Sequence, residues 1–214
     1  MTSGETSVGL RGHRVQNPER AEARRREVLL AAARVFARDG YGSTTLDEVA
    51  REVGVTKGVI YYYFHSKEEI LTEIRATAIR DAIARLRPII ESDRPAAIAL
   101  RDAVHDLVAH IFDELDRFAN VLRVGSRLSS EHHRTVRDLQ REYERMLRGL
   151  IERGIRDGVF APRDPAVTTF TLLRACLGVA DWYTTGGRLT PEQVVGQVTE
   201  QVLAGILLPD RREG

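Results

Sequence analysis

Residues 46–64 read LDEVAREVGVTKGVIYYYF, and three positions in this stretch form the pattern of a helix-turn-helix. Two short helices that cross closely need a small side chain where their backbones meet, and Ala50 supplies it. The turn between the helices favours a left-handed residue, a conformation that glycine adopts without steric cost, and Gly54 stands there. A branched apolar side chain, Ile60, then packs the second helix onto the first. The spacing of four residues and then six is the one that this motif uses, so the stretch predicts two crossed helices joined at Gly54.

The second of these helices is expected to turn one face outward. That face carries Lys57, Gly58, Tyr61 and Tyr62. The lysine ammonium and the tyrosine hydroxyls can donate to phosphate oxygens, and a glycine lets the backbone approach the floor of a DNA groove. The N-terminus of the helix adds N–H groups and partial positive charge. Three consecutive tyrosines could instead pack a core, but one short helix cannot bury all its faces, so burial is expected for Tyr63 alone.

Helical periodicity continues along almost the whole chain from about residue 18, with no alternating strand pattern. Thr45 and Thr56 are plausible N-caps of the two motif helices, and SKEE at residues 66–69 is a capping box that starts a long fourth helix. That helix is expected to end near Arg87, because Pro88 disfavours helical geometry at the residue before it. Further apolar helical segments cover residues 95–116, 118–128, 130–157, 165–183 and 190–208.

The sequence therefore predicts an all-α fold of nine or ten helices. An N-terminal three-helix, helix-turn-helix domain over residues 18–70 precedes a C-terminal helical ligand-binding and dimerisation domain over residues 71–210. Residues 1–17 are polar and are expected to form a disordered arm. The pattern over 165–183 is apolar nearly all round, and that over 190–208 has one clear apolar face. Such helices need burial, which predicts a homodimer built as a four-helix bundle on these last two helices.

Composition limits the classes of function further. Hydrophobic residues make up 43% of the chain and charged residues 29%, as in globular proteins. With no run of 18 apolar residues and no apolar leader, neither a membrane span nor a secretory signal is expected. The single cysteine, Cys176, fits a reducing cytoplasm and is interpreted as inert packing. Residues 1–67 carry 11 Lys and Arg against 8 Asp and Glu, a modestly basic head compatible with a small DNA footprint.

The motif region resembles the DNA-binding domain of TetR transcriptional regulators. The resemblance rests on TT at 44–45, GVTKG at 54–58, IYYYF at 60–64 and SKEE at 66–69. It implies a homodimer that binds palindromic double-stranded operator DNA, with its two recognition helices in successive major grooves. It also implies groove and backbone contacts from Thr45, Thr56, Lys57, Gly58, Tyr61 and Tyr62, with Lys67 on a phosphate. For Lys67 a solvated position is the alternative.

The C-terminal half resembles a narrower TetR subgroup, whose members govern fatty-acid and steroid breakdown and often sense acyl-CoA thioesters. The matching stretches are SSEH at 129–132, YER at 143–145, GI at 154–155, GVF at 158–160, and WY at 182–183 followed by GG at 186–187. One position departs from the pattern. Asp181 stands where such relatives often have an arginine suited to a CoA phosphate. The resemblance implies release from DNA by a small-molecule effector, an acyl-CoA or another hydrophobic metabolite.

An effector pocket is expected among the middle helices, lined by apolar groups with a few polar ones. The apolar candidates are Phe112, Leu115, Phe118, Leu122, Phe170, Leu173 and Trp182, for which ordinary core or dimer packing is the alternative. Arg123 or Arg174 could meet an anionic group. Arg174 lies inside an apolar helix, so it either pairs with an acidic residue of the protein, such as Asp181, or meets a ligand.

Other constellations do not support another chemistry. Glu131, His132 and His133 could indicate a metal, but adjacent histidines on a helix point roughly 100° apart, so no metal or cofactor is expected. Asp102, His105 and Asp106 share a face that is interpreted as solvated. An all-helical enzyme would need convergent acid–base or metal groups and would show turnover. A ligand-independent architectural DNA binder would need a far more basic surface, and its affinity would ignore every metabolite.

Overall fold

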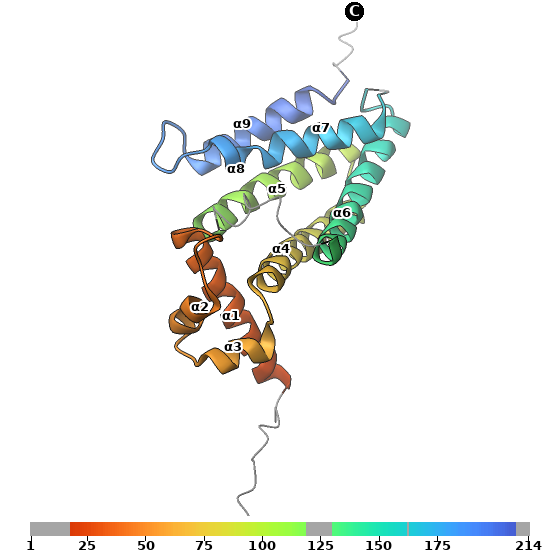
Figure 1. The fold of residues 1–214 in the computed structure, drawn as a ribbon. Coiled ribbons are helices and arrows are strands. Elements are labelled where there is room, and N and C mark those ends of the chain that lie inside the picture. Colours follow the sequence, from red (N-terminus) through yellow and green to blue (C-terminus); the bar gives the residue numbers. More distant parts are fainter. Residues whose placement is uncertain (1–17, 119–129, 162, 209–214) are drawn as a thin grey trace, which may run out of the picture.

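The protein is described by a computed structural model that covers residues 18–118, 130–161 and 163–208. Within these ranges every regular element is a helix, which confirms the predicted all-α fold. The helices are α1 (Pro18–Asp39), α2 (Leu46–Val53), α3 (Lys57–Tyr63), α4 (Lys67–Ile90), α5 (Ala96–Phe118), α6 (Ser130–Arg156), α7 (Pro165–Leu177), α8 (Val179–Trp182) and α9 (Pro191–Ala204). Figure 1 shows α1–α3 at one end of the molecule, α5–α9 toward the other, and α4 between them. The predicted N-terminal arm lies outside the described residues.

The N-terminal domain has its own hydrophobic core. The core is built from α1, α2 and α3 together with the first turns of α4, and its members include Val28, Phe36, Val49, Ala50, Ile60, Phe64, Ile70 and Ile74. Ala50 and Ile60 are both buried, as the helix-turn-helix pattern requires. Gly54 has φ +75°, so the left-handed turn predicted between α2 and α3 is confirmed. Because Ile74 belongs to this core, α4 enters the N-terminal domain for about two turns.

Local capping fixes where the motif helices begin. The Thr45 hydroxyl accepts from the Glu48 N–H at 3.3 Å, and the Glu48 carboxylate accepts from the Thr45 N–H at 2.6 Å. Thr56 occupies the N-cap position of α3, but its side chain makes no capping hydrogen bond. At the start of α4 the Ser66 hydroxyl accepts from the Glu69 N–H, as predicted. The Glu69 carboxylate accepts from the N–H of His65, whereas a capping box would use the N–H of the N-cap residue itself.

The predicted end of α4 near Arg87 is wrong, because the helix continues through Pro88 to Ile90. A proline in the last turn removes one hydrogen bond but leaves the following carbonyls in need of donors. Arg153 of α6 supplies them, since its guanidinium donates to the carbonyls of Ile90 at 3.2 Å and Ser92 at 3.4 Å. A contact between segments far apart in the sequence therefore sets this helix end.

The C-terminal domain packs around α5, which contacts α4, α6, α7, α8 and α9. In Figure 1, α7 and α9 run side by side across α5, and α6 closes the side against α4. The core includes Leu100, Val104, Val108, Leu147, Ile151, Phe160 and Leu203. Cys176 is fully buried, and burial raises the pKa of its thiol to about 12, so it stays protonated and unreactive at neutral pH.

Two expectations for the last helices need correction. The helix expected over 165–183 divides at Gly178, whose N–H donates to the carbonyls of Arg174 and Cys176 and closes α7 before α8 begins. The last helix stops at Ala204 instead of continuing to residue 208. The residues that follow it turn toward the end of α6, where the Ala161 N–H donates to the Ile206 carbonyl at 2.9 Å. This backbone pairing replaces the final helical turn.

Candidate nucleic-acid interface and effector site

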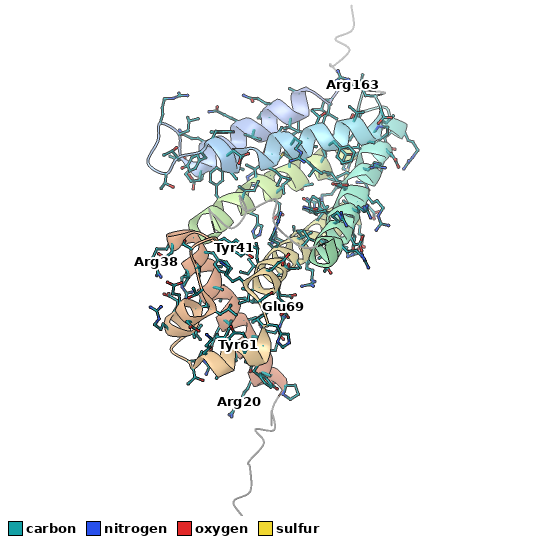
Figure 2. All side chains as sticks on the ribbon, viewed as in Figure 1. Arg20, Arg38, Tyr41, Tyr61, Glu69 and Arg163 are labelled. Carbon is teal, nitrogen blue, oxygen red and sulfur yellow. The ribbon has the colours of Figure 1, made fainter. Side chains whose placement is uncertain are left out.

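The recognition helix of the motif, α3, has one buried and one open face. Ile60 is fully buried against α1 and α2, whereas Lys57, Gly58, Tyr61 and Tyr62 are exposed. Figure 2 shows Tyr61 at the end of the molecule opposite the C-terminal helices. Tyr62 is the most open large side chain of the helix, with 61% of its surface exposed. An open surface with a cation, hydroxyls and a glycine is suited to contact with a polyanion.

Tyr63 behaves differently from its neighbours. It is half-buried, packs against the N-terminal core and meets the Tyr62 ring edge-to-face at 4.9 Å. Burial is expected for this tyrosine alone, and the structure buries it only in part, although it is the least exposed of the three. Its contact with Tyr62 restrains the exposed ring.

Lys57 is held by two neighbours on the open face. Its Nζ lies 2.9 Å from Oδ1 of Asp47, a residue in the first turn of α2. The same Nζ lies 5.6 Å from the centroid of the Tyr61 ring. The hydrogen bond from the ammonium to Asp47 raises the pKa of Lys57, so the side chain is charged at any physiological pH.

The two threonines flank the motif at exposed positions. Thr45 is engaged in the cap of α2, and its N–H and hydroxyl hold the pKa of Glu48 below the ordinary value. Thr56 begins α3 with a side chain that makes no capping bond. A side chain at Gly58 would meet little, with Oγ1 of Thr56 the nearest atom at 3.9 Å. The surface directly above Gly58 is therefore not covered by other side chains of the chain.

Lys67 has partners inside the protein and is not simply solvated. Its Nζ donates to the carbonyls of Tyr41 at 2.7 Å and Gly42 at 3.1 Å. It also lies 4.8 Å from the centre of the Tyr41 ring. These contacts tie the start of α4 to the turn between α1 and α2. An ammonium has three N–H donors, so one of them is left for a phosphate.

Among the side chains that the structure describes, the residues expected to form the effector pocket are divided between the core and the surface. Phe112 and Leu173 are buried in the C-terminal core, where the Phe112 ring meets Tyr183 edge-to-face at 4.7 Å. Phe170 and Trp182 are exposed, and so is Arg174. The side chains of Leu115, Phe118, Leu122 and Arg123 lie outside what the structure describes.

Arg174, which the sequence places inside an apolar helix, is exposed in the structure and not buried. An apolar sequence does not show how much of a helix is covered, and α7 buries only the side bearing Thr169, Leu172, Leu173 and Cys176. In the single chain solvent reaches the guanidinium of Arg174, so burial within the chain does not require a partner for it.

The uncovered side of α7 contributes to an apolar groove of about 560 Å³ against α9. Val167, Trp182, Val198 and Val202 are among the residues that line it. Val167 is 64% exposed and Trp182 57% exposed, unusual values for such side chains in adjacent elements. This face has the character of a protein–protein contact surface.

The structure identifies a polar cluster that the sequence pattern did not reveal. Arg85 of α4 donates through Nε to Asp106 of α5 at 3.1 Å, between helices and partly out of solvent. Asp106 was expected on a solvated face. Arg85 Nη2 is buried, and no hydrogen-bond acceptor lies within reach among the described residues. Tyr143 of α6 is close by, and burial, reinforced by the Asp106 carboxylate, raises the pKa of its hydroxyl.

A small helix-turn-helix domain with an open recognition helix, joined to a larger helical domain, defines a DNA-binding transcriptional regulator. Residues 28–74 match the family of bacterial regulatory proteins, tetR family, and residues 93–206 match the tetracyclin repressor-like C-terminal domain. The chain belongs to the TetR family, whose members are transcriptional regulators that bind operator DNA as dimers.

Relatives agree with this assignment along most of the chain. The HTH-type transcriptional repressor KstR2 of Rhodococcus jostii is 29% identical, over 87% of this chain and 92% of its own. The crystal structure of a TetR/AcrR-family regulator from Thermobifida fusca is 32% identical with a TM-score of 0.73, over 86% of this chain and 98% of its own. AibR, solved with isovaleryl coenzyme A and operator DNA, shares the fold at 22% identity, with a TM-score of 0.74, over 83% of this chain and 97% of its own.

Two further kinds of feature are absent from the described part of the chain. No helix in that part of the chain is long and apolar enough to cross a membrane. No group of three or more His, Cys, Asp or Glu side chains there is arranged to hold a metal ion. The histidines at 132 and 133 lie outside the side chains that the structure describes.

Proposed function

We propose that this protein is a cytoplasmic, ligand-responsive repressor that binds a palindromic operator as a homodimer and leaves it when an acyl-CoA binds. The observation that carries the DNA-binding part is the open face of α3, where a cation, two hydroxyls and a glycine lie together. α3 enters the major groove, and its partner copy enters the next one roughly 34 Å away. The contacts come from Thr45, Thr56, Lys57, Gly58, Tyr61, Tyr62 and the remaining N–H of Lys67.

Replacing Lys57 by alanine is expected to weaken binding to all duplexes and to reduce the salt dependence of the affinity by about one unit of slope. Each phosphate contact that is lost releases one fewer counterion. The fold should survive, because an exposed ion pair such as Lys57–Asp47 contributes little to stability. Fluorescence anisotropy at several salt concentrations measures the slope. Arg145→Ala, the loss of an exposed charge on α6, is the matched control, and a slope equal to that of the control would remove Lys57 from the interface.

The dimer uses the groove between α7 and α9 together with α8. Two copies of this face, related by a two-fold axis, form a four-helix bundle that covers Val167, Phe170 and Trp182. Covering these side chains removes from water the most exposed large apolar groups of the C-terminal domain, which is the driving force for association. The exposed aromatic residues expected in the effector pocket are thereby assigned to dimerisation.

The effector binds inside the C-terminal domain between α4, α5, α6 and α7, with Phe112 and Leu173 on the apolar side. Its anionic end meets Arg85, whose buried Nη2 can donate a hydrogen bond and has no acceptor among the described residues. A buried donor without an acceptor is costly, so an anion there is favourable. The isovaleryl coenzyme A bound by the same fold in AibR supports a CoA thioester.

Arg85 lies on α4, the helix that also enters the N-terminal core. A ligand that competes with Asp106 for Arg85 shifts α4 and, with it, the spacing of the two recognition helices. The shift needs a coupling free energy of about 1–3 kcal/mol between the two sites.

Acyl-CoAs of rising chain length, titrated into the protein–operator complex, are expected to release the DNA, whereas free CoA is not. Arg85→Gln should raise the concentration for half-release about tenfold, because one charge-assisted hydrogen bond is lost. Arg174→Gln distinguishes the two arginines, since Arg174 lies on the side of α7 opposite the core and should matter little to the effector. Release by the free fatty acid but not the thioester points away from CoA, and release by neither contradicts the proposed effector.

A further inference from the structure

Three charged and aromatic groups from two helices meet on the DNA-facing surface. The Lys57 ammonium lies 2.9 Å and 3.0 Å from the two carboxylate oxygens of Asp47, and it also lies against the Tyr61 ring. The side chains of Lys57 and Asp47 are 56% and 53% exposed, so the pair stands at the surface and not in the core. A carboxylate thus accompanies the cation that the recognition helix presents to DNA.

Stability explains the carboxylate at this position only in part, because an acidic side chain in the first turn of α2 interacts favourably with the helix dipole. Exposed ion pairs add little to folding, and the capping box of α2 is completed by Glu48, with the contacts of Asp47 running to Lys57. Asp47 also brings a negative charge to a surface that must approach phosphates. The whole segment 1–67 has only a small basic excess, with 11 Lys and Arg against 8 Asp and Glu. One carboxylate therefore changes the net charge of this segment by a large fraction.

We infer that Asp47 is a specificity-determining residue that acts by positioning Lys57: it weakens binding to DNA of any sequence more than binding to the operator. This inference rests on the proposed placement of α3 in the major groove. Non-specific binding comes from phosphate charge neutralisation, and a carboxylate beside a lysine weakens the attraction of that lysine for the backbone without abolishing it. The pair therefore penalises the wrong partner, which is one of the two routes to specificity.

The operator complex loses less from the same pair. An ammonium that gives one hydrogen bond to Asp47 keeps two N–H donors, and the Tyr61 ring restrains the direction in which they point. Guanine O6 and N7 are the acceptors that a lysine reads in the major groove. Because Asp47 and Tyr61 hold the ammonium in place, less side-chain freedom is lost when it meets a base edge. Asp47 thus lowers the affinity for DNA of any sequence and increases the discrimination between the operator and other DNA.

The test begins with the wild-type protein, which selects its preferred duplex from a random-sequence pool. Dissociation constants are then measured for that duplex and for a random duplex of equal length at several KCl concentrations. Asp47→Asn should bind the random duplex about tenfold tighter, with a salt slope steeper by about one unit, and bind the selected duplex within about threefold of wild type. Asp93→Asn is the control, because it removes one exposed carboxylate beyond the far end of the 24-residue helix α4.

A second pair of variants separates positioning from simple repulsion. In a Lys57→Ala background, Asp47→Asn should leave the ratio of selected to random affinity unchanged, because no ammonium remains to be held. The inference would be overturned if Asp47→Asn lowered the ratio of selected to random affinity equally in the wild-type and Lys57→Ala backgrounds. It would also be overturned if Asp47→Asn and Asp93→Asn gave the same ratio. Failure of the wild type to enrich any sequence would overturn the proposed function itself, whereas an enriched duplex with an unchanged ratio overturns this inference alone.

Discussion

Replacing Val167 by arginine is expected to convert the protein to a monomer and to lower its operator affinity at least about a hundredfold. Val167 is 64% exposed in the single chain and lines the groove between α7 and α9 that we assign to the dimer. In the bundle the new guanidinium would be buried without a partner, at a cost of several kcal/mol in each copy. Since about 1.4 kcal/mol is tenfold in an equilibrium constant, association should fail at micromolar concentration. A monomer reaches only one half-site.

Val167 is a sharper probe than the valines of α9. Val198 and Val202 are half-buried within the chain, so an arginine there would disturb folding and association together. Sedimentation velocity over a range of concentrations gives the dimer constant. Leu30→Arg is the matched control, because Leu30 is 48% exposed on α1, far from the groove, and the variant should remain a dimer. A Val167→Arg dimer as strong as the control would place the interface elsewhere.

The helix-turn-helix was readable from the sequence because short-range chemistry specifies it. A left-handed glycine at 54, a reciprocal cap between Thr45 and Glu48, and an apolar residue at 60 act over a few residues each. Each of these signals favours the same local structure, so tertiary packing had nothing to override. The fold class and the family followed from this stretch and from helical periodicity.

Partners that are distant in the sequence explain most of what was missed. The end of α4 depends on Arg153, which is supplied by a helix two elements later. For Lys67 the sequence offered a phosphate contact or a solvated position. Nothing in the neighbouring sequence shows that its ammonium donates to the carbonyls of Tyr41 and Gly42. The pairing of Arg85 with Asp106 likewise joins two helices whose relative rotation no periodicity specifies.

Periodicity also failed to show how much of α7 is covered. An apolar pattern on every side is satisfied equally by an intramolecular core and by a second subunit. The chain itself covers the side bearing Leu172 and Leu173, and it leaves the side bearing Phe170 and Arg174 open. The candidate effector residues share only their residue type, and among the described ones Phe112 and Leu173 are buried in the core whereas Phe170 and Trp182 are exposed.

Replacing Gly154 by alanine is expected to lower the free energy of unfolding by about 3 kcal/mol, among the largest effects of adding one methyl group to this protein. A Cβ on Gly154 would lie 2.8 Å from Cγ of Phe160 and closer still to two other ring carbons. The ring is 1% exposed, so the core around it leaves no room to retreat. The N–H groups of Val159 and Phe160 both donate to the Gly154 carbonyl, at 3.0 Å and 3.1 Å, which holds the turn against the glycine.

Gly149→Ala, the same chemical change in the same helix, should have the opposite sign. Gly149 is exposed, and a Cβ there meets no atom within 4 Å, so alanine should stabilise α6 by about 0.5–1 kcal/mol through its helix propensity. Urea denaturation of both variants at one protein concentration measures the difference, because the stability of a dimer depends on concentration. If both variants changed the free energy of unfolding in the same direction, the Phe160 ring would be able to move away from α6. Close packing at Gly154 would then not fix the turn between α6 and α7.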